Sequence, residues 1–556
     1  MKTMSVHGWL ALAGGLSLAC AVNVSPPELP VVTLEEAPPP IAGGTLAALR
    51  DGRTAVVADP DRDAIYVVDL DRGALTRRFE VEPGSEPGRI AEDTLGRAHV
   101  LLRRGGALLT FAPADPEPRR TPLCAAPRGI DAAGDGSLIV ACADGALLEV
   151  DRSLAVHPLA LLPPGLRDVA VLGDVILVTH LRSAAVHVLS REGATLRTVA
   201  PPPVALDGLP YTANTALRLR RQGERAWLLH QRSRLGPEPA PTDEYAGRFR
   251  GPCGESAVQV VVSEVGWTGV RTAGVLRGGA FAVDLDVFEG ELAIAVPSAI
   301  GGTPAQREHR VRRVREGATC LAEGSPASVD GQPVAVAFGV TGELLVFSRE
   351  PALLLAGERA IALSSESRRD TGHDLFHAAR EGVACASCHA EGAEDGHLWT
   401  LGGAPPRRTS TLRGGILTTA PFHADGSVPS LGEVVSRQFP DVHDDARVGA
   451  LGLWLDALEP IPVPPRDPTS VERGRLVFEL AGCADCHAGP LGTRTQPGAQ
   501  IPTLVDLADR GPYLSSGCAS ELEEVLIGPC SPPEHGRASE LTDEDRAALV
   551  AYLRAR

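Results

Sequence analysis

Two short cysteine-histidine motifs carry the clearest chemistry in this sequence. They read "CASCH" and "CADCH", with thiols at Cys385, Cys388, Cys483 and Cys486 and histidines at His389 and His487. Two thiols at this spacing can form thioethers with the two vinyl groups of one haem, and the adjacent histidine then ligates the iron. Zinc is the alternative, but a four-ligand zinc site needs a second cysteine pair, which neither motif has. The sequence predicts two covalently bound c-type haems.

The second axial ligand of each haem has to be sought among few residues. Methionine is a common choice, yet the only methionines are Met1 and Met4. Each iron is therefore expected to be bis-histidine, bound by another group such as water, or five-coordinate. His397 is the candidate for the first haem and His535 for the second, and an ordinary loop histidine is the alternative for both.

Three further groups of polar residues come into question near the haems. His423 is a candidate hydrogen-bond donor or alternative ligand, or else a polar turn residue. Arg407 and Arg408 are candidates for pairing with haem propionates, with a solvated pair as the alternative. His373 and His377 share one face of an expected helix, which we expect to be solvated or to lie at the haem edge.

The segment 43–365 is expected to be an all-β domain that precedes the motifs. Short runs of Val, Ile, Leu and Ala recur behind turn residues, as in "DAIYVVDLDRG", which resembles YVTN-type propeller repeats. Seven strand-opening glycines mark the repeat: Gly52, Gly96, Gly136, Gly173, Gly223, Gly290 and Gly342. Their spacing predicts a seven-bladed β-propeller, and a different all-β fold is the alternative.

The segments 366–462 and 463–556 are expected to be two mostly α-helical cytochrome c domains. Each has a helical pattern before its motif, and the chain ends in "SELTDEDRAALVAYLRAR", which has a capping signature and one apolar face. The predicted fold class is therefore multidomain, with an all-β propeller followed by two helical haem domains.

The N-terminus indicates export. Residues 1–20 resemble a signal peptide that ends at a lipobox-like Cys20, and plain secretion is the alternative. Residues 21–42 are rich in Pro and Glu and are predicted to be a disordered tether. We expect a periplasmic or outer-membrane lipoprotein of a Gram-negative bacterium, attached to the membrane only through its lipid.

The charge and the remaining cysteines agree with that compartment. A net charge of −17 argues against a nucleic-acid partner. An even number of cysteines remains, which predicts disulfides, with buried thiols as the alternative. Pairing of sequence neighbours gives Cys124–Cys142, Cys253–Cys320 and Cys518–Cys530.

A family resemblance adds to these expectations. "CASCH", "DGHLW", "APPRRTSTL" and "APFHADGSVPSLGEVV" resemble the first haem domain of bacterial di-haem cytochrome c peroxidases and of their relatives that mature methylamine dehydrogenase. "RGRLVFELAGCADCHAGP" and "GPYLSSGCASELEEVL" follow the order of the second domain. The resemblance implies a peroxide-reacting first haem whose displaceable distal ligand is His397, and a calcium ion between the haem domains.

The departures from that family pattern concern its catalytic residues. Ala424 stands where the peroxidases carry a tryptophan between the haems, and Ser515 and Ser516 replace a His-Asp pair. The family's acid-base residues have no clear counterpart, although Gln438 or Asp441 could substitute for them.

Together these observations predict an exported, peroxidase-like di-haem oxidoreductase. Its second haem would take electrons from a small redox protein or a quinone-linked donor and pass them to the first, which would reduce peroxide or oxidise a substrate. One alternative is a non-catalytic bis-histidine electron-transfer protein, and another is a propeller that serves as a binding scaffold with the haems as a relay. The oligomeric state stays open.

Overall fold

The computed structural model describes residues 30–556 except for 207–208, 237–256, 277–280, 298–310, 316–319, 322–330, 380–382, 401–405, 424, 439–443, 463–466, 497–498 and 533–534. The chain divides into two compact units, residues 1–30 and 31–556, and the second unit contains all the elements below. The predicted signal peptide and Cys20 lie outside the described residues. Within the described ranges, no helix combines the length and the apolar character needed to cross a membrane.

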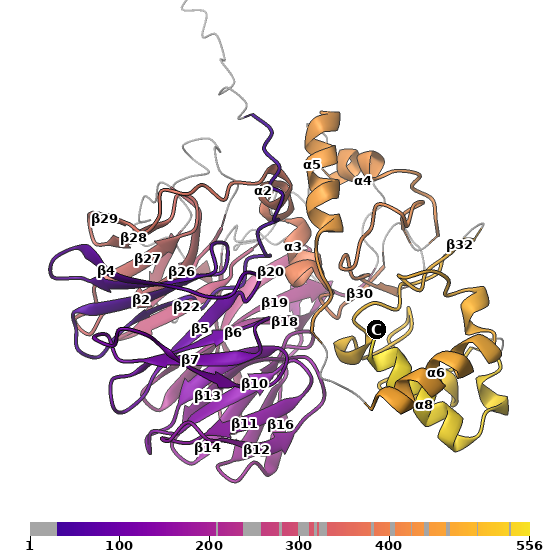
Figure 1. Ribbon diagram of the computed structural model, residues 1–556, viewed down its shortest axis with the longest axis horizontal. Coiled ribbons are helices and arrows are strands. Elements are labelled where there is room, and N and C mark those ends of the chain that lie inside the picture. Colours follow the sequence, from indigo (N-terminus) through magenta and orange to yellow (C-terminus); the bar gives the residue numbers. More distant parts are fainter. Residues whose placement is uncertain are drawn as a thin grey trace, which may run out of the picture. The chain divides into compact units, whose positions relative to one another are not determined.

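The first part of the second unit is a β-propeller of seven sheets (Figure 1). The strands of blades 1 to 4 are β1 (Leu46–Ala48), β2 (Thr54–Asp59), β3 (Ala64–Asp69), β4 (Ala74–Glu80); β5 (Pro87–Glu92), β6 (Ala98–Leu102), β7 (Ala107–Phe111), β8 (Arg119–Pro122); β9 (Pro127–Ala132), β10 (Leu138–Cys142), β11 (Ala146–Val150), β12 (Val156–Leu161); and β13 (Leu166–Leu172), β14 (Val175–His180), β15 (Val186–Ser190), β16 (Thr195–Val199).

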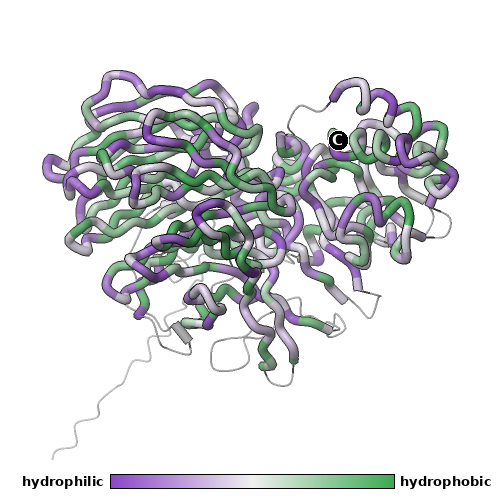
Figure 2. The backbone as a smooth tube through the Cα atoms, turned by 90° about the horizontal axis from the view of Figure 1, so that it is seen from below, coloured by the Kyte–Doolittle hydropathy of each residue, from purple (hydrophilic) through white to green (hydrophobic). Residues whose placement is uncertain are grey.

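The remaining three blades are less uniform. Their strands are β17 (Val204–Leu206), β18 (Leu209–Gln222), β19 (Arg225–Arg234), β20 (Val258–Gly266), β21 (Gly269–Leu276) with β25 (Cys320–Leu321); β22 (Asp284–Phe288), β23 (Glu291–Ala295), β24 (Val311–Arg315); and β26 (Pro333–Phe338), β27 (Leu344–Ser348), β28 (Leu353–Ala356), β29 (Arg359–Ala362). All pairings are antiparallel except β21 with β25. Figure 2 shows the hydrophobic stretches running along these strands.

The seven glycines that marked the repeat all occupy one equivalent position. Each lies in the turn between the two innermost long strands of its blade, with φ between 54° and 87°. A backbone in this left-handed region favours glycine, because a side chain there clashes with the preceding carbonyl. The prediction of seven blades is confirmed. The sequence feature that revealed the repeat was the glycine of this turn and not the pattern of the strands.

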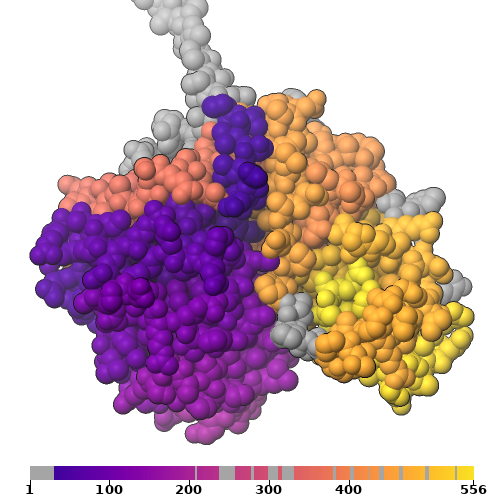
Figure 3. Space-filling view, in the orientation of Figure 1, coloured from indigo at the N-terminus to yellow at the C-terminus, as the bar shows by residue number. Residues whose placement is uncertain are grey.

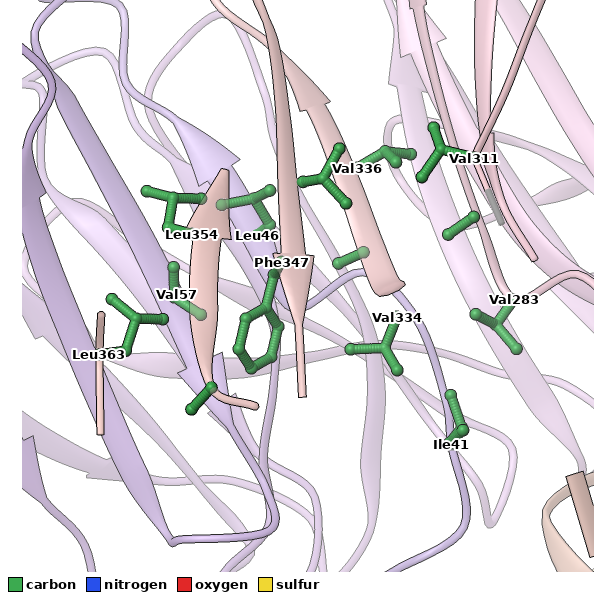
Figure 4. Packing of buried hydrophobic residues seen from close by; sticks show 14 of the residues in the cluster. Ile41, Leu46, Val57, Val283, Val311, Val334, Val336, Phe347, Leu354 and Leu363 are labelled. Atoms are coloured by element: carbon green, nitrogen blue, oxygen red, sulfur yellow. The ribbon is translucent and has the colours of Figure 1, made fainter. Parts of the chain in front are cut away.

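The propeller ring closes by packing. Every blade except the fifth, which adds β25 beside β21, uses consecutive strands, and blade 7 contacts blade 1 through β26 and β27 against β1. Figure 4 shows the hydrophobic cluster at this closure, which includes Val57 of blade 1, Val311 of blade 6 and Phe347 of blade 7. The same cluster continues into the helical part through Phe376 and Trp454.

Two helical domains follow. The elements of the first are α2 (Thr371–His377), α3 (Cys385–Cys388), η1 (Ala390–Gly392), β30 (Leu398–Trp399), β31 (Arg407–Arg408), α4 (Leu431–Gln438) and α5 (Asp445–Asp456). Those of the second are α6 (Pro468–Leu480), η2 (Cys483–Asp485), β32 (Thr495–Gln496), β33 (Ala499–Gln500), η3 (Leu507–Asp509), α7 (Leu522–Leu526), η4 (Ala538–Glu540) and α8 (Asp543–Arg554).

Each helical domain is built on one close helix crossing. A Cβ atom on Gly474 of α6 would lie 2.0 Å from the carbonyl oxygen of Ala548 in α8. A Cβ atom on Gly372 of α2 would lie 2.3 Å from the carbonyl oxygen of Ala450 in α5. Only glycine therefore allows the two backbones to approach this closely, and the same device serves both domains.

The predicted tether of residues 21–42 is wrong for its second half. The backbone of Val32 pairs with Thr371, the indole of Trp454 donates to the Pro38 carbonyl (2.9 Å), and the Ile41 amide donates to His377 Nε2 (3.2 Å). Figure 3 shows this indigo segment, residues 31–42, between the propeller and α5. The segment is ordered because helices more than 300 residues away accept and supply its backbone hydrogen bonds.

His373 and His377 are fully buried, contrary to the expectation of a solvated or haem-edge face. His377 Nδ1 donates to the His373 carbonyl (2.8 Å), while its Nε2 accepts from Ile41, so the ring is held as one neutral tautomer. Burial lowers the pKa of both imidazoles well below the usual value, and nearby Arg349 adds to the effect. These two histidines join α2 to the propeller and to residues 31–42.

Candidate haem-binding sites

The second cysteine motif is arranged to bind a haem iron through His487. The motif forms η2 just after α6, and the His487 amide donates to the Cys483 carbonyl (2.9 Å). His487 Nδ1 donates to the Gly492 carbonyl (2.8 Å). This bond fixes the tautomer and leaves Nε2 as the ligating atom, as in many metal-binding histidines.

His535 lies opposite His487. The two ring centres are 6.2 Å apart, and His535 Nδ1 lies 3.4 Å from the Val525 carbonyl oxygen. A metal–imidazole bond is about 2 Å, and each ring centre lies about 1 Å behind its nitrogen, so two imidazoles on one iron have centres about 6 Å apart. The observed spacing would fit one iron between the two rings, so His535 stays the candidate for the second axial ligand.

The first cysteine motif repeats this local geometry. The cysteines form the short helix α3, the His389 amide donates to the Cys385 carbonyl (2.8 Å), and His389 Nδ1 donates to the Ser410 carbonyl (3.0 Å). Burial lowers the pKa of His389 to about 4 and raises the pKa of the Cys385 thiol to about 12. A neutral imidazole with its Nδ1 committed is what an axial ligand requires.

The turn that follows each motif is also repeated. In the first domain the Phe422 amide donates to Val428 (2.6 Å) and Gly426 to His423 (2.9 Å). In the second, the Tyr513 amide donates to Ala519 (2.5 Å) and Gly517 to Leu514 (3.1 Å). His423 and Leu514 both have φ of 65°. The two domains therefore share a helix crossing, a motif and a turn, and are structural repeats of each other.

His397 does not pair with His389 in the structure. Its Nε2 donates to the carbonyl of Arg234 in blade 5 (2.9 Å), and its ring packs edge-on against Trp399. Within the described ranges, His487 and His535 form a facing pair, whereas His389 has no such ring opposite it. The nitrogen that would bind iron is thus used in a contact with the propeller, and a ligand role for His397 has no geometric support here.

The predicted propionate pair separates into two environments. Arg408 is mostly buried and pairs with the carboxylate of Glu394, which also accepts from Arg510 Nε (2.7 Å) of the second domain. Arg407 precedes it on β31, and neighbouring residues of a strand point to opposite faces. Arg407 has no ion pair in the part of the chain that the structure describes, so it is the better candidate for a propionate. Arg408 instead joins the two helical domains.

The remaining residues singled out from the sequence are exposed, outside the described residues or in other contacts. His423 is exposed on the turn of the first domain. Gln438 ends α4, and its side chain, like Asp441, Ala424 and Cys253, lies outside the described residues. The Ser515 carbonyl accepts from the Arg408 amide (2.9 Å), another link between the haem domains. The structure contains two of the predicted disulfides, Cys124–Cys142 and Cys518–Cys530.

Arginines on the inner strands of the propeller were missed by the sequence reasoning. Four of these arginines are buried: Arg89, Arg128, Arg167 and Arg218. Arg89 Nη1 donates to the Arg128 carbonyl (2.8 Å), and Arg218 pairs with both Asp168 (2.8 Å) and Asp284 (3.0 Å). A sequence signal was present for three of them, because Arg89, Arg128 and Arg167 each lie near the start of the first strand of a blade.

The fold and the sites define a seven-bladed β-propeller followed by a helical region that contains a cytochrome c domain. Residues 471–556 match the cytochrome c family. This family binds haem c covalently and uses it for electron transfer. The cysteine thiols of the second motif, the fixed His487 and the facing His535 fit such a group.

Solved structures resemble the chain only weakly. No curated protein matches the chain. Hydrazine synthase of Kuenenia stuttgartiensis has 14% identity and a TM-score of 0.46, over 59% of this chain and 98% of that structure. Virginiamycin B lyase from Staphylococcus aureus has 11% and 0.39, over 58% and 94%. The WD40 propeller domain of Doa1 has 9% and 0.40, over 59% and 96%. Similarity at this level says nothing about function.

Proposed function

We propose that the chain is a di-haem c-type oxidoreductase that passes electrons between its two helical domains. The structural repeat carries the proposal: the first domain has the same helix crossing, Cys-x-x-Cys-His geometry and turn as the cytochrome c domain. Haem bound at each site would supply one-electron redox chemistry. His389 and His487 would hold it, each with Nδ1 bonded to a backbone carbonyl.

The second domain is proposed as the entry point for electrons. His487 and His535 would both ligate the iron of a haem bound there, which would leave no position for a substrate. Contacts of Glu394 with both Arg408 and Arg510 hold the two domains together. Fixed geometry and saturated coordination are suited to electron transfer, because little has to move when an electron arrives.

Peroxidase-like chemistry at the first site is the second candidate. His397 contacts the propeller through the Arg234 carbonyl and not His389, so the second axial position of a haem on His389 could be taken by a small ligand such as peroxide. Reduction of peroxide to water takes two electrons and two protons, which a two-haem chain can deliver from one-electron donors. The family resemblance supports this candidate, while Ala424, Ser515 and Ser516 depart from the catalytic pattern.

The propeller is a weaker candidate for a ligand-binding scaffold, because the end that faces the first helical domain is already filled by that domain. Glu391 of the first haem domain is buried there among Arg103, Arg128 and Arg167. Export, the lipid at Cys20, and a small redox protein or quinone-linked donor remain proposals that rest on the sequence. Calcium does as well, and the described residues contain no group of three or more His, Cys, Asp or Glu side chains suited to a metal.

Haem counting and spectroscopy test the proposal. A pyridine haemochrome assay should give two haems per chain, falling to one when Cys385 and Cys388, or Cys483 and Cys486, are replaced by alanine. One haem in the unaltered protein would refute the di-haem function. EPR of the half-reduced protein with and without peroxide then separates the candidates. A high-spin or exchangeable site that reacts with peroxide supports the enzyme, and two unchanging low-spin signals support electron transfer alone.

A further inference from the structure

The loop after the first haem motif is inserted into the propeller. Glu391 lies two residues after His389 and is 8% exposed. Its carboxylate contacts Arg103 after β6 (3.1 Å), Arg128 on β9 (3.7 Å) and Arg167 on β13, which belong to three successive blades. The guanidinium groups of these three arginines surround the buried carboxylate and compensate its charge. The carboxylate is therefore a fixed negative charge.

The same loop is tied to the proximal histidine. Arg413 Nη2 donates to the Glu391 carbonyl (2.6 Å), and the Gly392 amide donates to the His389 carbonyl (2.9 Å). His389 in turn donates from Nδ1 to Ser410, three residues before Arg413. The short helix η1 thus connects the ion-paired carboxylate to the imidazole through a few rigid bonds.

Two further observations indicate that the glutamate is selected for its side chain. Its φ of 53° lies in the left-handed region, which disfavours residues other than glycine. The position that follows the second motif by the same interval is Gly489, which lacks a side chain. Covalent haem attachment therefore does not itself need a glutamate here, and the propeller contact distinguishes the first site from the second.

We propose that Glu391 is a positioning residue for the first haem, through which the arginines of blades 2 to 4 fix the orientation of His389 and the charge beside it. The proposal rests on the proposed function only in requiring a haem on His389. The propeller would then influence the potential of the first haem through these charges and have no such effect on the second. Loss of the carboxylate would leave buried arginines uncompensated, which favours an added electron.

Glu391→Gln tests this directly, because it keeps the shape of the side chain and removes its charge. We expect the midpoint potential of the first haem to rise and its EPR g-values to change, while the second haem keeps both. Glu459→Gln is the matched control. Glu459 also pairs with a propeller arginine, Arg104 (2.5 Å), but its side chain is 73% exposed, so both haems should stay unchanged.

The outcomes are distinguishable. A folded Glu391→Gln protein with unaltered potentials and g-values overturns the proposal, and so does an equal change at both haems, which indicates general loosening. If Glu391→Gln does not fold, Arg128→Lys decides, since it keeps the charge and alters the longest of the three contacts. An unchanged first haem in that variant overturns the proposal. The haem count of the unaltered protein is measured first, so failure of the di-haem function is recognised separately.

Discussion

The two helical domains have the same architecture and differ in what covers their first helix. In α2 the residues that follow the crossing glycine are buried against blade 7 and residues 31–42: His373, Asp374 and His377. In α6 the residues at the same positions are largely exposed: Arg475, Leu476 and Glu479. The same helical fold can therefore pack its first helix against a β-propeller or expose it to solvent. The residues on one face of that helix differ accordingly between the two domains.

Their hydrophobic cores show the same contrast. The cluster around Phe376 and Trp454 is continuous with blades 1, 6 and 7. The cluster around Phe478 and Leu549 belongs to the second domain alone. The first haem domain thus shares its stabilising contacts with the propeller, whereas the second has its own core. Four changes would break or sharpen this comparison.

The largest difference is expected between His535→Ala and His397→Ala. Loss of His535 should convert the low-spin signal of the second haem to a high-spin one, because it removes an axial imidazole. Loss of His397 should leave both EPR signals unchanged and lower the free energy of unfolding by about 1 kcal/mol, since it removes one hydrogen bond to Arg234. A low-spin signal that disappears in His397→Ala would show that this residue binds iron after all.

Alanine at either crossing glycine should be strongly destabilising. Its Cβ would meet a backbone carbonyl oxygen at 2.0 Å for Gly474 and 2.3 Å for Gly372, so the helices must separate, at a cost of about 3 kcal/mol or more. Calorimetry should assign the Gly474→Ala effect to the second domain and the Gly372→Ala effect to the propeller transition. Gly449→Ala is the control, because nothing lies within 4 Å of its added Cβ and the helix should be slightly more stable.

Removal of the Cys518–Cys530 disulfide should loosen only the second domain. The bond closes a segment with a sequence separation of 12, which is worth about 3 kcal/mol for a loop of this size. The first domain has Ser427 where the second has Cys518, so its turn is stable without a disulfide. The thermal midpoint of Cys518→Ala/Cys530→Ala should fall in the second transition, and an equal fall in the first would contradict separate cores.

The smallest effect concerns Asp374 and depends on pH. Burial raises the pKa of Asp374 to about 6, although Arg349 and Arg369 oppose the shift. The unfolded carboxyl releases its proton near pH 4, so the unaltered protein loses stability as the pH rises from about 4 to 6. Asp374→Asn should therefore be more stable above pH 6, by about 1–2 kcal/mol, and equal near pH 4.

The control for this pH effect is Glu479→Gln on the exposed face of α6. Its carboxylate pairs with Arg475 in solvent, so the free energy of unfolding should change by less than about 0.5 kcal/mol at any pH. Denaturant unfolding at pH 4, 6 and 8 measures both variants. An Asp374→Asn protein that is less stable than the unaltered one at pH 8 would show that the carboxylate is stabilising.

Local chemistry could be predicted from the sequence. The turn glycines, the Cys-x-x-Cys-His motifs and the two disulfides between sequence neighbours each depend on residues a short distance apart. The position of His535 opposite His487 could be anticipated, because the chain offers no methionine beyond Met4 as a second ligand. In each case the physical constraint acts within one loop or one blade.

Long-range partners could not be predicted. His397 binds the carbonyl of a residue 163 positions earlier, and nothing near it in sequence points there. Residues 31–42 have the composition of a tether, and only helices of the first haem domain make them ordered. The buried charge of Glu391 likewise makes sense only beside arginines from three blades.

The way the propeller ring closes has a consequence for folding. Among the strands that the structure describes, none from one end of the propeller pairs into the blade at the other end, and blades 1 and 7 share a packed cluster that includes Phe376 and Trp454. The first haem domain therefore acts as the last piece of the propeller, and the two should unfold as one cooperative unit. A protein shortened after residue 462 should keep this unit intact, whereas deletion of residues 366–462 should open the ring.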